Sequence, residues 1–217
     1  MKDSVIVLSG GMDSTTMLYE YKENIALAIT FDYGSIQNAE EQIFASLHCR
    51  KLSIQHLIIP LDFMHKYFKS ALLSSPEDIP TINYDEENMK STVVPFRNGI
   101  MLSIACGIAE SNNLNRVLIA NHSGDHSIYP DCRPEFIESI AKTISLGTYR
   151  NIEVFAPYTN LSKKKIAEKG NFLGIDYSET YSCYKGGRLH CGKCATCRER
   201  REALLMAGIP DNTKYEE

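Results

Sequence analysis

Two groups of residues in this chain have the types and the spacing that chemistry requires. The first is the hexapeptide Ser9-Gly10-Gly11-Met12-Asp13-Ser14, which directly follows the apolar run Val5–Leu8. Paired glycines let the backbone approach a ligand closely. A helix start favours an anion, because its first N–H groups are unpaired and its dipole is positive there. The lysine of the nucleotide triphosphatase loop is absent, so the hexapeptide predicts a pyrophosphate site of another class.

The acidic residue in this loop needs an explanation of its own. Asp13 would repel a phosphate unless a magnesium ion lies between them, so we expect magnesium to bind with the phosphate. Pairing of the Asp13 carboxylate with the helix dipole is compatible with the same role. The alternative for the whole hexapeptide is an ordinary turn between a strand and a capped helix.

The second group is a set of cysteines near the C-terminus. Of seven cysteines, four lie within 15 residues at Cys183, Cys191, Cys194 and Cys197. Four thiolates around one ion are typical of a closed structural zinc site. An iron–sulfur cluster uses the same spacing, but nothing else in the chain indicates redox chemistry. Unligated cysteines are the third alternative. We predict one zinc ion per subunit that holds the C-terminal segment in place and takes no part in the reaction.

The residues between these groups predict the scaffold. Buried strands are expected at 5–8, 25–31, 56–59, 117–120 and 152–155, and helices at 14–21, 38–52, 98–110, 134–146 and 162–173. This alternation predicts a doubly wound α/β fold around a mostly parallel five-stranded sheet. Asn38 and Ser162 are the expected N-caps of their helices. Residues 62–95 show little periodicity and are expected to form a lid or a partner surface.

Composition and charge exclude several classes of protein. The chain has 217 residues, 43% of them hydrophobic, and can bury a core rather than remain disordered. Its apolar runs are too short for a membrane-spanning helix or for a signal peptide, so we expect a cytoplasmic protein. The net charge is −4 and there is no basic tail, which argues against general nucleic-acid binding.

The hexapeptide resembles the pyrophosphatase-loop signature of ATP-dependent adenylating enzymes, such as asparagine synthetases and NAD synthetase. With the cysteines and the segments 31–34, 94–98, 129–136 and 182–184, the chain resembles the 7-cyano-7-deazaguanine synthases of queuosine biosynthesis. The resemblance spans nearly the whole chain. It departs at Ser35-Ile36-Gln37, where many members of the family carry Gln-Arg-His, so no role is carried over to these side chains.

The resemblance implies an adenine nucleotide alpha hydrolase-like fold and an ATP-dependent ligase. The family's substrate is 7-carboxy-7-deazaguanine, whose carboxylate is activated by transfer of AMP. Ammonia then gives the amide, and a second activation of the amide oxygen leaves the nitrile. Most of the rate should come from positioning and electrostatics. The resemblance further implies a homodimer. Mg²⁺ is expected with ATP, and free ammonia is the expected nitrogen source because the sequence has no recognisable glutaminase domain. Along the chain, we expect residues 1–175 to form an ATP-binding domain and 176–217 to form a zinc-binding segment with a helix.

Residue roles follow from the same resemblance. The expected ATP contacts are Leu8, Ser9, Gly10, Gly11, Met12, Asp13, Ser14 and Phe31. The candidate catalytic residues are Arg97, Asp131 and Lys163. The expected substrate contacts are Asp125, Tyr129, Arg133 and Glu135. These four follow the fourth strand, where a carboxylate could pair with the N–H edge of the base.

Each of these residues has a structural alternative. Phe31 could be an ordinary core residue, and Arg97 could form a surface ion pair. Asp131 could cap the helix that starts at Pro134, and Lys163 could lie on a solvated face. Cys132 lies within the most specific segment and is either a catalytic thiol or a small packing residue.

Three other functions compete with this interpretation. A tRNA thiolation enzyme also adenylates through such a loop, but it needs sulfur-carrying cysteines and a basic surface. A non-catalytic zinc module for nucleic acid or a protein partner would leave the loop unexplained. A relative could also transfer the activated deazaguanine to an amine on a protein instead of ammonia.

Overall fold

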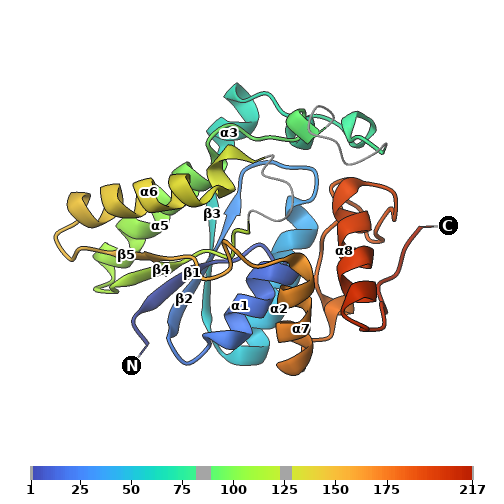
Figure 1. Cartoon of the computed structure of the whole chain (residues 1–217). Helices are drawn as coiled ribbons and strands as arrows, with labels where there is room; N and C mark the ends of the chain where they lie inside the picture. Colours follow the sequence, from blue (N-terminus) through green and yellow to red (C-terminus); the bar gives the residue numbers. More distant parts are fainter. Residues whose placement is uncertain (1, 82–88, 123–128, 217) are drawn as a thin grey trace.

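A five-stranded, all-parallel sheet forms the centre of the molecule (Figure 1). The computed structural model describes residues 2–81, 89–122 and 129–216. The strands are β1 (Ser4–Val7), β2 (Ile25–Asp32), β3 (Gln55–Pro60), β4 (Arg116–Leu118) and β5 (Glu153–Phe155), in the order β3-β2-β1-β4-β5. The predicted α/β fold is confirmed.

Helices cover both faces of the sheet (Figure 1). On one face lie α1 (Met12–Glu20), α2 (Asn38–Leu52) and α7 (Lys163–Phe172), which enclose a core with Ile6 and Leu18. On the other lie α5 (Arg97–Ser111) and α6 (Pro134–Gly147), which enclose a second core with Val5 and Leu102. Both faces of β1 are therefore buried, which explains its continuous apolar run.

Two local expectations differ from the structure. The first helix begins at Met12 rather than at Ser14, so that Asp13 lies in its first turn. The segment 62–95 is more ordered than predicted, since it contains α3 (Asp62–Tyr67) and two short 3-10 helices, Ala71–Leu73 and Pro76–Asp78. Residues 82–88 of this segment lie outside the described residues.

One of the two predicted helix caps is wrong. Asn38 is the first residue of α2, and its Oδ1 accepts hydrogen bonds from the backbone nitrogens of Tyr33 and Ser35 at 3.1 and 2.9 Å. The side chain therefore closes the turn between β2 and α2 instead of capping the helix. Ser162 does cap α7, because its Oγ accepts from the backbone nitrogen of Lys165.

The C-terminal segment contains α8 (Ala195–Met206), which packs against α7 (Figure 1). Arg200 of α8 is fully buried and donates to the side chains of Thr180 and Thr213, each at 2.9 Å, and to the carbonyl of Tyr177. These bonds tie α8 both to the segment that precedes it and to the one that follows it. The division of the chain at residue 175 stays a prediction.

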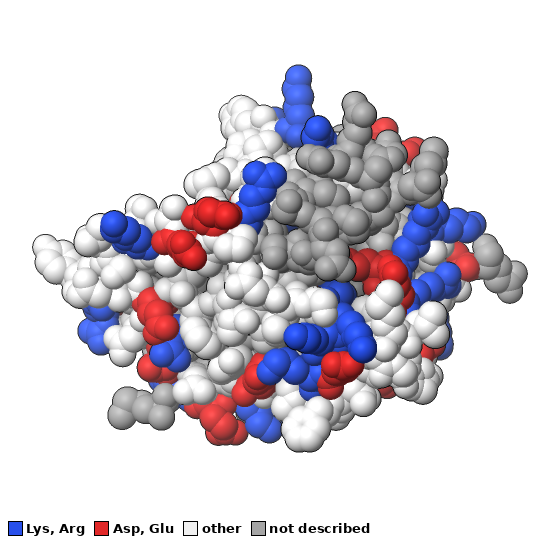
Figure 2. Space-filling view, in the orientation of Figure 1, with Lys and Arg blue, Asp and Glu red and all other residues white. Residues whose placement is uncertain are grey.

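The surface carries charges of both signs. On the face drawn in Figure 2, basic and acidic side chains are interspersed over the described residues. Within the part of the chain that the structure describes, no helix combines the length and the apolar character needed to cross a membrane.

Candidate active site and metal centre

A cavity of about 270 Å³ lies at the carboxyl ends of β1, β2 and β4. The order of strands reverses here, since β2 and β4 lie on opposite sides of β1. Such reversal points are where open α/β sheets bind ligands. The wall is built from the loop after β1, from the first turns of α2 and α5, and from the segment around the start of α8. Residues from the whole length of the chain therefore meet at one site.

The loop 9–14 fits tightly against α2. Gly10 has a φ of 74°, and a Cβ atom there would lie 2.7 Å from the backbone nitrogen of Ala45 and from the carbonyl oxygen of Glu41. Only glycine allows both this conformation and this approach. Seven of the eight predicted ATP contacts line the cavity, namely Leu8, Ser9, Gly11, Met12, Asp13, Ser14 and Phe31. The eighth, Gly10, is not among the described lining residues.

The first polar group in the cavity is centred on an ion pair. Lys163 Nζ lies 2.6 Å from Asp13 Oδ2 and 3.8 Å from Glu199 Oε2. His122 Nε2 lies 3.5 Å from the same Asp13 oxygen. Burial alone would raise the pKa of Asp13, but Lys163 and His122 outweigh burial and hold this pKa below its usual value. Burial would lower the pKa of Lys163, yet Asp13 and Glu199 raise it, so the lysine stays charged.

The other oxygen of Asp13 is available for a ligand. Oδ1 is buried and has no hydrogen-bond partner among the described residues. A buried carboxylate oxygen without a partner is costly, and carboxylate oxygens are the ligands that Mg²⁺ prefers. The hydroxyls of Ser9 and Ser14, which lie 3.1 Å apart, line the same wall. This set of oxygens fits a magnesium ion bound together with phosphate.

A second polar group lies where α2 and α5 begin. Arg97 donates from Nη1 to the hydroxyl of Tyr33 at 3.1 Å. Glu41 and Gln37, one helical turn apart, line the cavity beside them. Burial raises the pKa of Glu41 to about 7, although Arg97 and the side chain of Gln37 act in the opposite direction. Sequence reasoning placed Arg97 at the site but missed the two residues of α2.

A signal for these two residues was present in the sequence. Gln37, Glu41, Ala45 and Cys49 follow one another at intervals of four residues, the spacing of a single helix face. Ala45 and Cys49 are buried against the sheet. A carboxylate on the buried face of a helix indicates either a paired charge or a functional group.

The segment after β4 contributes less to the cavity than expected. Tyr129 lines it, with its hydroxyl 3.1 Å from Thr92 Oγ1 and 3.3 Å from the hydroxyl of Tyr184. Arg133 and Glu135 are exposed and are not among the described residues that line the cavity. Asp125 lies outside the described residues.

Asp131 has a structural contact instead of a place in the cavity wall. Its Oδ2 accepts a hydrogen bond from the backbone nitrogen of Asn98 at 2.8 Å, in the first turn of α5. It makes no cap for α6, so the alternative of a cap before Pro134 is wrong. The Asp131 carboxylate accepts a hydrogen bond from an N–H group in the first turn of α5, the turn to which Arg97 belongs. It also attracts the Arg97 guanidinium. Asp131 therefore fits a positioning role better than direct contact with a substrate.

The cavity also contains a cysteine. Cys132 lines the wall, and the side-chain nitrogen of Asn98 donates to its Sγ at 3.3 Å. Burial and the nearby Asp131 raise the pKa of the Cys132 thiol to about 11. Because only the thiolate is a good nucleophile, the structure favours a packing role for Cys132 at neutral pH.

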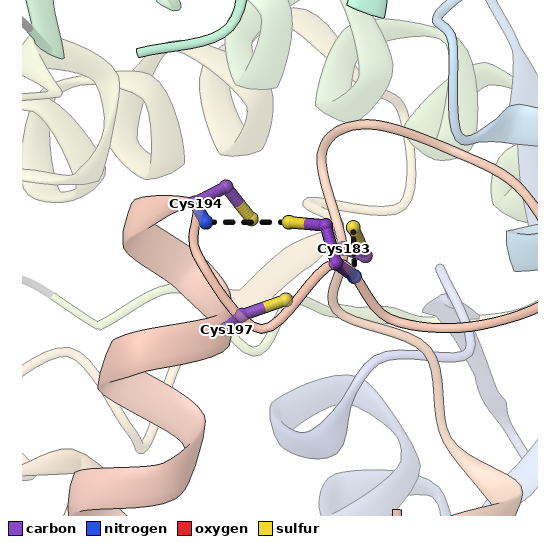
Figure 3. A group of neighbouring side chains, drawn as sticks. Cys183, Cys194 and Cys197 are labelled. Carbon is purple, nitrogen blue, oxygen red and sulfur yellow. Dashed lines mark hydrogen bonds between the residues drawn. The ribbon is translucent and has the colours of Figure 1, made fainter. Parts of the chain in front are cut away.

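The four C-terminal cysteines form a compact buried cluster. The sulfurs of Cys183, Cys191, Cys194 and Cys197 all lie within 4.8 Å of one another. Figure 3 shows the three labelled side chains, Cys183, Cys194 and Cys197, pointing toward a common centre. Zinc–sulfur bonds of about 2.3 Å in a tetrahedron place sulfurs roughly 3.8 Å apart, so the cluster needs little adjustment to enclose an ion. Hydrogen bonds from Cys183 and Cys197 lower the pKa of Cys194, which favours a thiolate there. The cluster could hold a metal such as zinc.

The cysteine cluster supports one wall of the cavity. Tyr184 follows Cys183 directly, and Thr196 and Glu199 lie beside Cys197 in α8. All three line the cavity. Loss of an ion from the cluster would therefore loosen this wall without removing any group from the loop after β1.

Comparisons with known proteins agree with these features. The family model described as queuosine biosynthesis protein QueC matches residues 3–208. A 7-cyano-7-deazaguanine synthase of Porphyromonas gingivalis is 61% identical over 215 residues, covering 99% of this chain and 98% of the relative. One from Desulfotalea psychrophila is 51% identical over 217 residues, covering 99% of both. The NMN synthetase from Francisella tularensis shares the fold, with a TM-score of 0.54 and 14% identity over 96% of this chain and 78% of that one.

Proposed function

Because this chain belongs to the QueC family of queuosine biosynthesis proteins, we propose that it is a 7-cyano-7-deazaguanine synthase. In this reaction an ATP-dependent ligase converts 7-carboxy-7-deazaguanine and ammonia into the nitrile. The observation that carries the proposal is the meeting of the loop after β1, Lys163 and Arg97 around one cavity. The substrate carboxylate and the phosphates of the nucleotide are both anions, so a site that brings them together needs positively charged groups.

The first step is the transfer of AMP to the substrate carboxylate. A carboxylate oxygen attacks the α-phosphorus of ATP, and the bond to the pyrophosphate oxygen breaks. The helix start at Gly11 and the hydroxyls of Ser9 and Ser14 would bind the phosphates. Lys163 would neutralise the charge that develops on the leaving pyrophosphate, and Asp13 would hold Mg²⁺ through its unpaired oxygen. Magnesium, when bound, supplies charge neutralisation on the phosphate oxygens.

Ammonia then attacks the carbonyl carbon of the mixed anhydride, and AMP leaves. The product is a primary amide, whose oxygen occupies nearly the position of the former carboxylate oxygen. A second adenylation of this oxygen, followed by loss of AMP and two protons, gives the nitrile. One cavity can therefore serve both activations. Arg97 would neutralise the substrate carboxylate or the phosphate, and Asp131 would position Arg97 from behind.

The remaining expectations belong to the same proposal. The cysteine cluster would hold one structural zinc ion. Residues 1–175 would bind ATP, and 176–217 would form the zinc segment. Tyr129 is the one expected substrate contact that lines the cavity among the described residues. A homodimer, a cytoplasmic location and the absence of a nucleic-acid partner are expected from the family resemblance and from the composition.

Mass spectrometry of a complete reaction tests the proposal. The zinc-loaded protein is incubated with ATP, magnesium, ammonium and 7-carboxy-7-deazaguanine, and the proposal predicts the nitrile with AMP and pyrophosphate. Accumulated amide would mean that only the first activation is supported. If a folded sample fails to consume ATP, the proposed function is wrong, and tRNA and protein acceptors become the next substrates.

A further inference from the structure

The first turn of α2 offers hydrogen-bond acceptors to the cavity that the adenylation chemistry does not use. Gln37 is 2% exposed, and its side-chain oxygen has no hydrogen-bond partner among the described residues. Glu41, one turn further along α2, also lines the cavity. The backbone of α2 that carries Glu41 is held in place, because it packs directly against Gly10 at Glu41 and Ala45.

Charged groups around this pair define what it can bind. Burial raises the pKa of Glu41, and the Arg97 guanidinium acts in the opposite direction. Burial also raises the pKa of Tyr33, and the Glu41 carboxylate acts in the same direction. The side chain of Gln37 stabilises the Glu41 carboxylate, which leaves the Gln37 oxygen free to accept. Arg97 gives one donor to Tyr33 and, as a guanidinium, carries several more. The wall thus presents two neighbouring acceptors with a strong donor beside them.

This arrangement complements one particular base edge. The guanine-type edge has two adjacent donors, the ring N–H and the exocyclic amino group, followed by a carbonyl acceptor. An adenine edge instead places its amino donor next to a ring nitrogen that accepts, which a carboxylate would repel. A buried carboxylate also gains most from neutral donors, because it has given up its water.

We infer that Glu41 and Gln37 recognise the N–H and amino edge of the 7-deazaguanine substrate and so determine which base the enzyme activates. Arg97 lines the same cavity and counteracts the effect of burial on the pKa of Glu41, and its guanidinium would donate to the carbonyl on the same edge. The inference rests on the proposed function and names the part of the site that selects its substrate. Among the acidic residues expected in this role, Asp131 accepts a hydrogen bond from the start of α5 and Glu135 is exposed, while Asp125 lies outside the described residues.

A binding cycle between one residue and one substrate group tests the inference. The dissociation constants of 7-carboxy-7-deazaguanine and of its analogue without the 2-amino group are measured by titration calorimetry. Magnesium and α,β-methylene ATP are present, so that no turnover occurs. The proteins are the wild type, Glu41→Gln, Gln37→Met and the control Glu40→Gln, whose residue lies in the same turn of α2 but not in the cavity lining. Thermal melting confirms that each variant is folded.

We expect the wild type and Glu40→Gln to bind the analogue about tenfold to a hundredfold more weakly than the full substrate. In Glu41→Gln the ratio between the two dissociation constants should shrink to about threefold or less, because the amino group no longer has a carboxylate as its hydrogen-bond partner. Gln37→Met should shrink it in the same direction by a smaller factor. The affinity of each variant for the ATP analogue should stay within about twofold of the wild type.

Two results would overturn the inference. Loss of the amino group could weaken binding equally in the wild type and in Glu41→Gln, which would place this edge elsewhere. Alternatively, Glu41→Gln could weaken the ATP analogue and not the base, which would assign the pair to adenine. Failure of the proposed function looks different: the wild type would bind the deazaguanine but form no nitrile, and the binding cycle would still decide the inference.

Discussion

The charge on Glu41 should cost the folded protein stability, and its removal should show this directly. Burial in the cavity wall raises the pKa of this carboxyl from 4.5 to about 7. The folded state therefore binds a proton more tightly than the unfolded state does. This group's contribution to stability is complete below about pH 4.5 and is lost as the pH rises through about 7. Glu41→Gln removes the ionisation but keeps the size and the polarity of the side chain.

The magnitude follows from the two pKa values. Each pKa unit corresponds to about 1.4 kcal/mol, so the full effect is about 3 kcal/mol. Between pH 5 and pH 8 the stability of Glu41→Gln, relative to the wild type, should rise by about 2.5 kcal/mol. The pKa of about 7 already includes the attraction of Arg97, so the loss of this attraction in the variant adds an offset that does not change with pH.

The assay is urea unfolding of both proteins at pH 5, 6, 7 and 8, followed by circular dichroism. Both proteins contain the same cysteine cluster, so its own pH dependence cancels in the difference. Glu40→Gln serves as the control and should follow the wild type. If the difference between Glu41→Gln and the wild type stays constant across this range, Glu41 is not held in a dehydrated site and its pKa is not raised.

Three further perturbations test other parts of the site. Lys163→Met should lower kcat by about 10²–10³ while the metal content stays unchanged. Lys164→Met changes a residue on the exposed side of α7 and should leave kcat unchanged. Steady-state kinetics of AMP release measure kcat for both variants. In urea unfolding, Gly10→Ala should destabilise the protein by more than Gly187→Ala does. Both residues have positive φ, but only Gly10 also contacts the backbone of α2. Equal losses of stability would mean that α2 can move to make room for the added Cβ atom. Cys194→Ser should lower the bound zinc from about one ion per chain toward zero and should also lower the melting temperature. Atomic absorption measures the zinc content. A variant that retains its full zinc content would contradict ligation by four cysteines.

Local patterns were sufficient to predict the fold, the loop after β1 and the cysteine cluster. The strand β1 is buried on both faces, and such a strand is apolar at every position. Cys191, Cys194 and Cys197 are close in sequence, so their spacing nearly fixes their geometry. Only Cys183 must arrive from outside this short run. The ends of elements were predicted less well, as the start of α1 at Met12 shows.

Long-range contacts explain what could not be predicted. Asp131 caps a helix that begins 34 residues earlier in the chain, at Arg97, and no local signal in its own segment indicates this partner. Asn38 has the residue type of a cap, but its side chain is used by the preceding turn. Both are cases where several local partners compete and the tertiary structure selects one. His122 comes from the end of β4 and meets Asp13 only because β4 pairs with β1.

The proposed reaction adenylates the two carboxylate oxygens of the substrate one after the other in the same cavity. Its most direct test is the reaction of 7-carboxy-7-deazaguanine labelled with ¹⁸O at both carboxylate oxygens, followed by mass spectrometry of the nucleotide products. Stepwise adenylation predicts two AMP molecules for each nitrile formed, each carrying one ¹⁸O atom. Unlabelled AMP, or ADP and phosphate in its place, would contradict it, because the substrate oxygens would then leave by a route that does not pass through the α-phosphate of ATP.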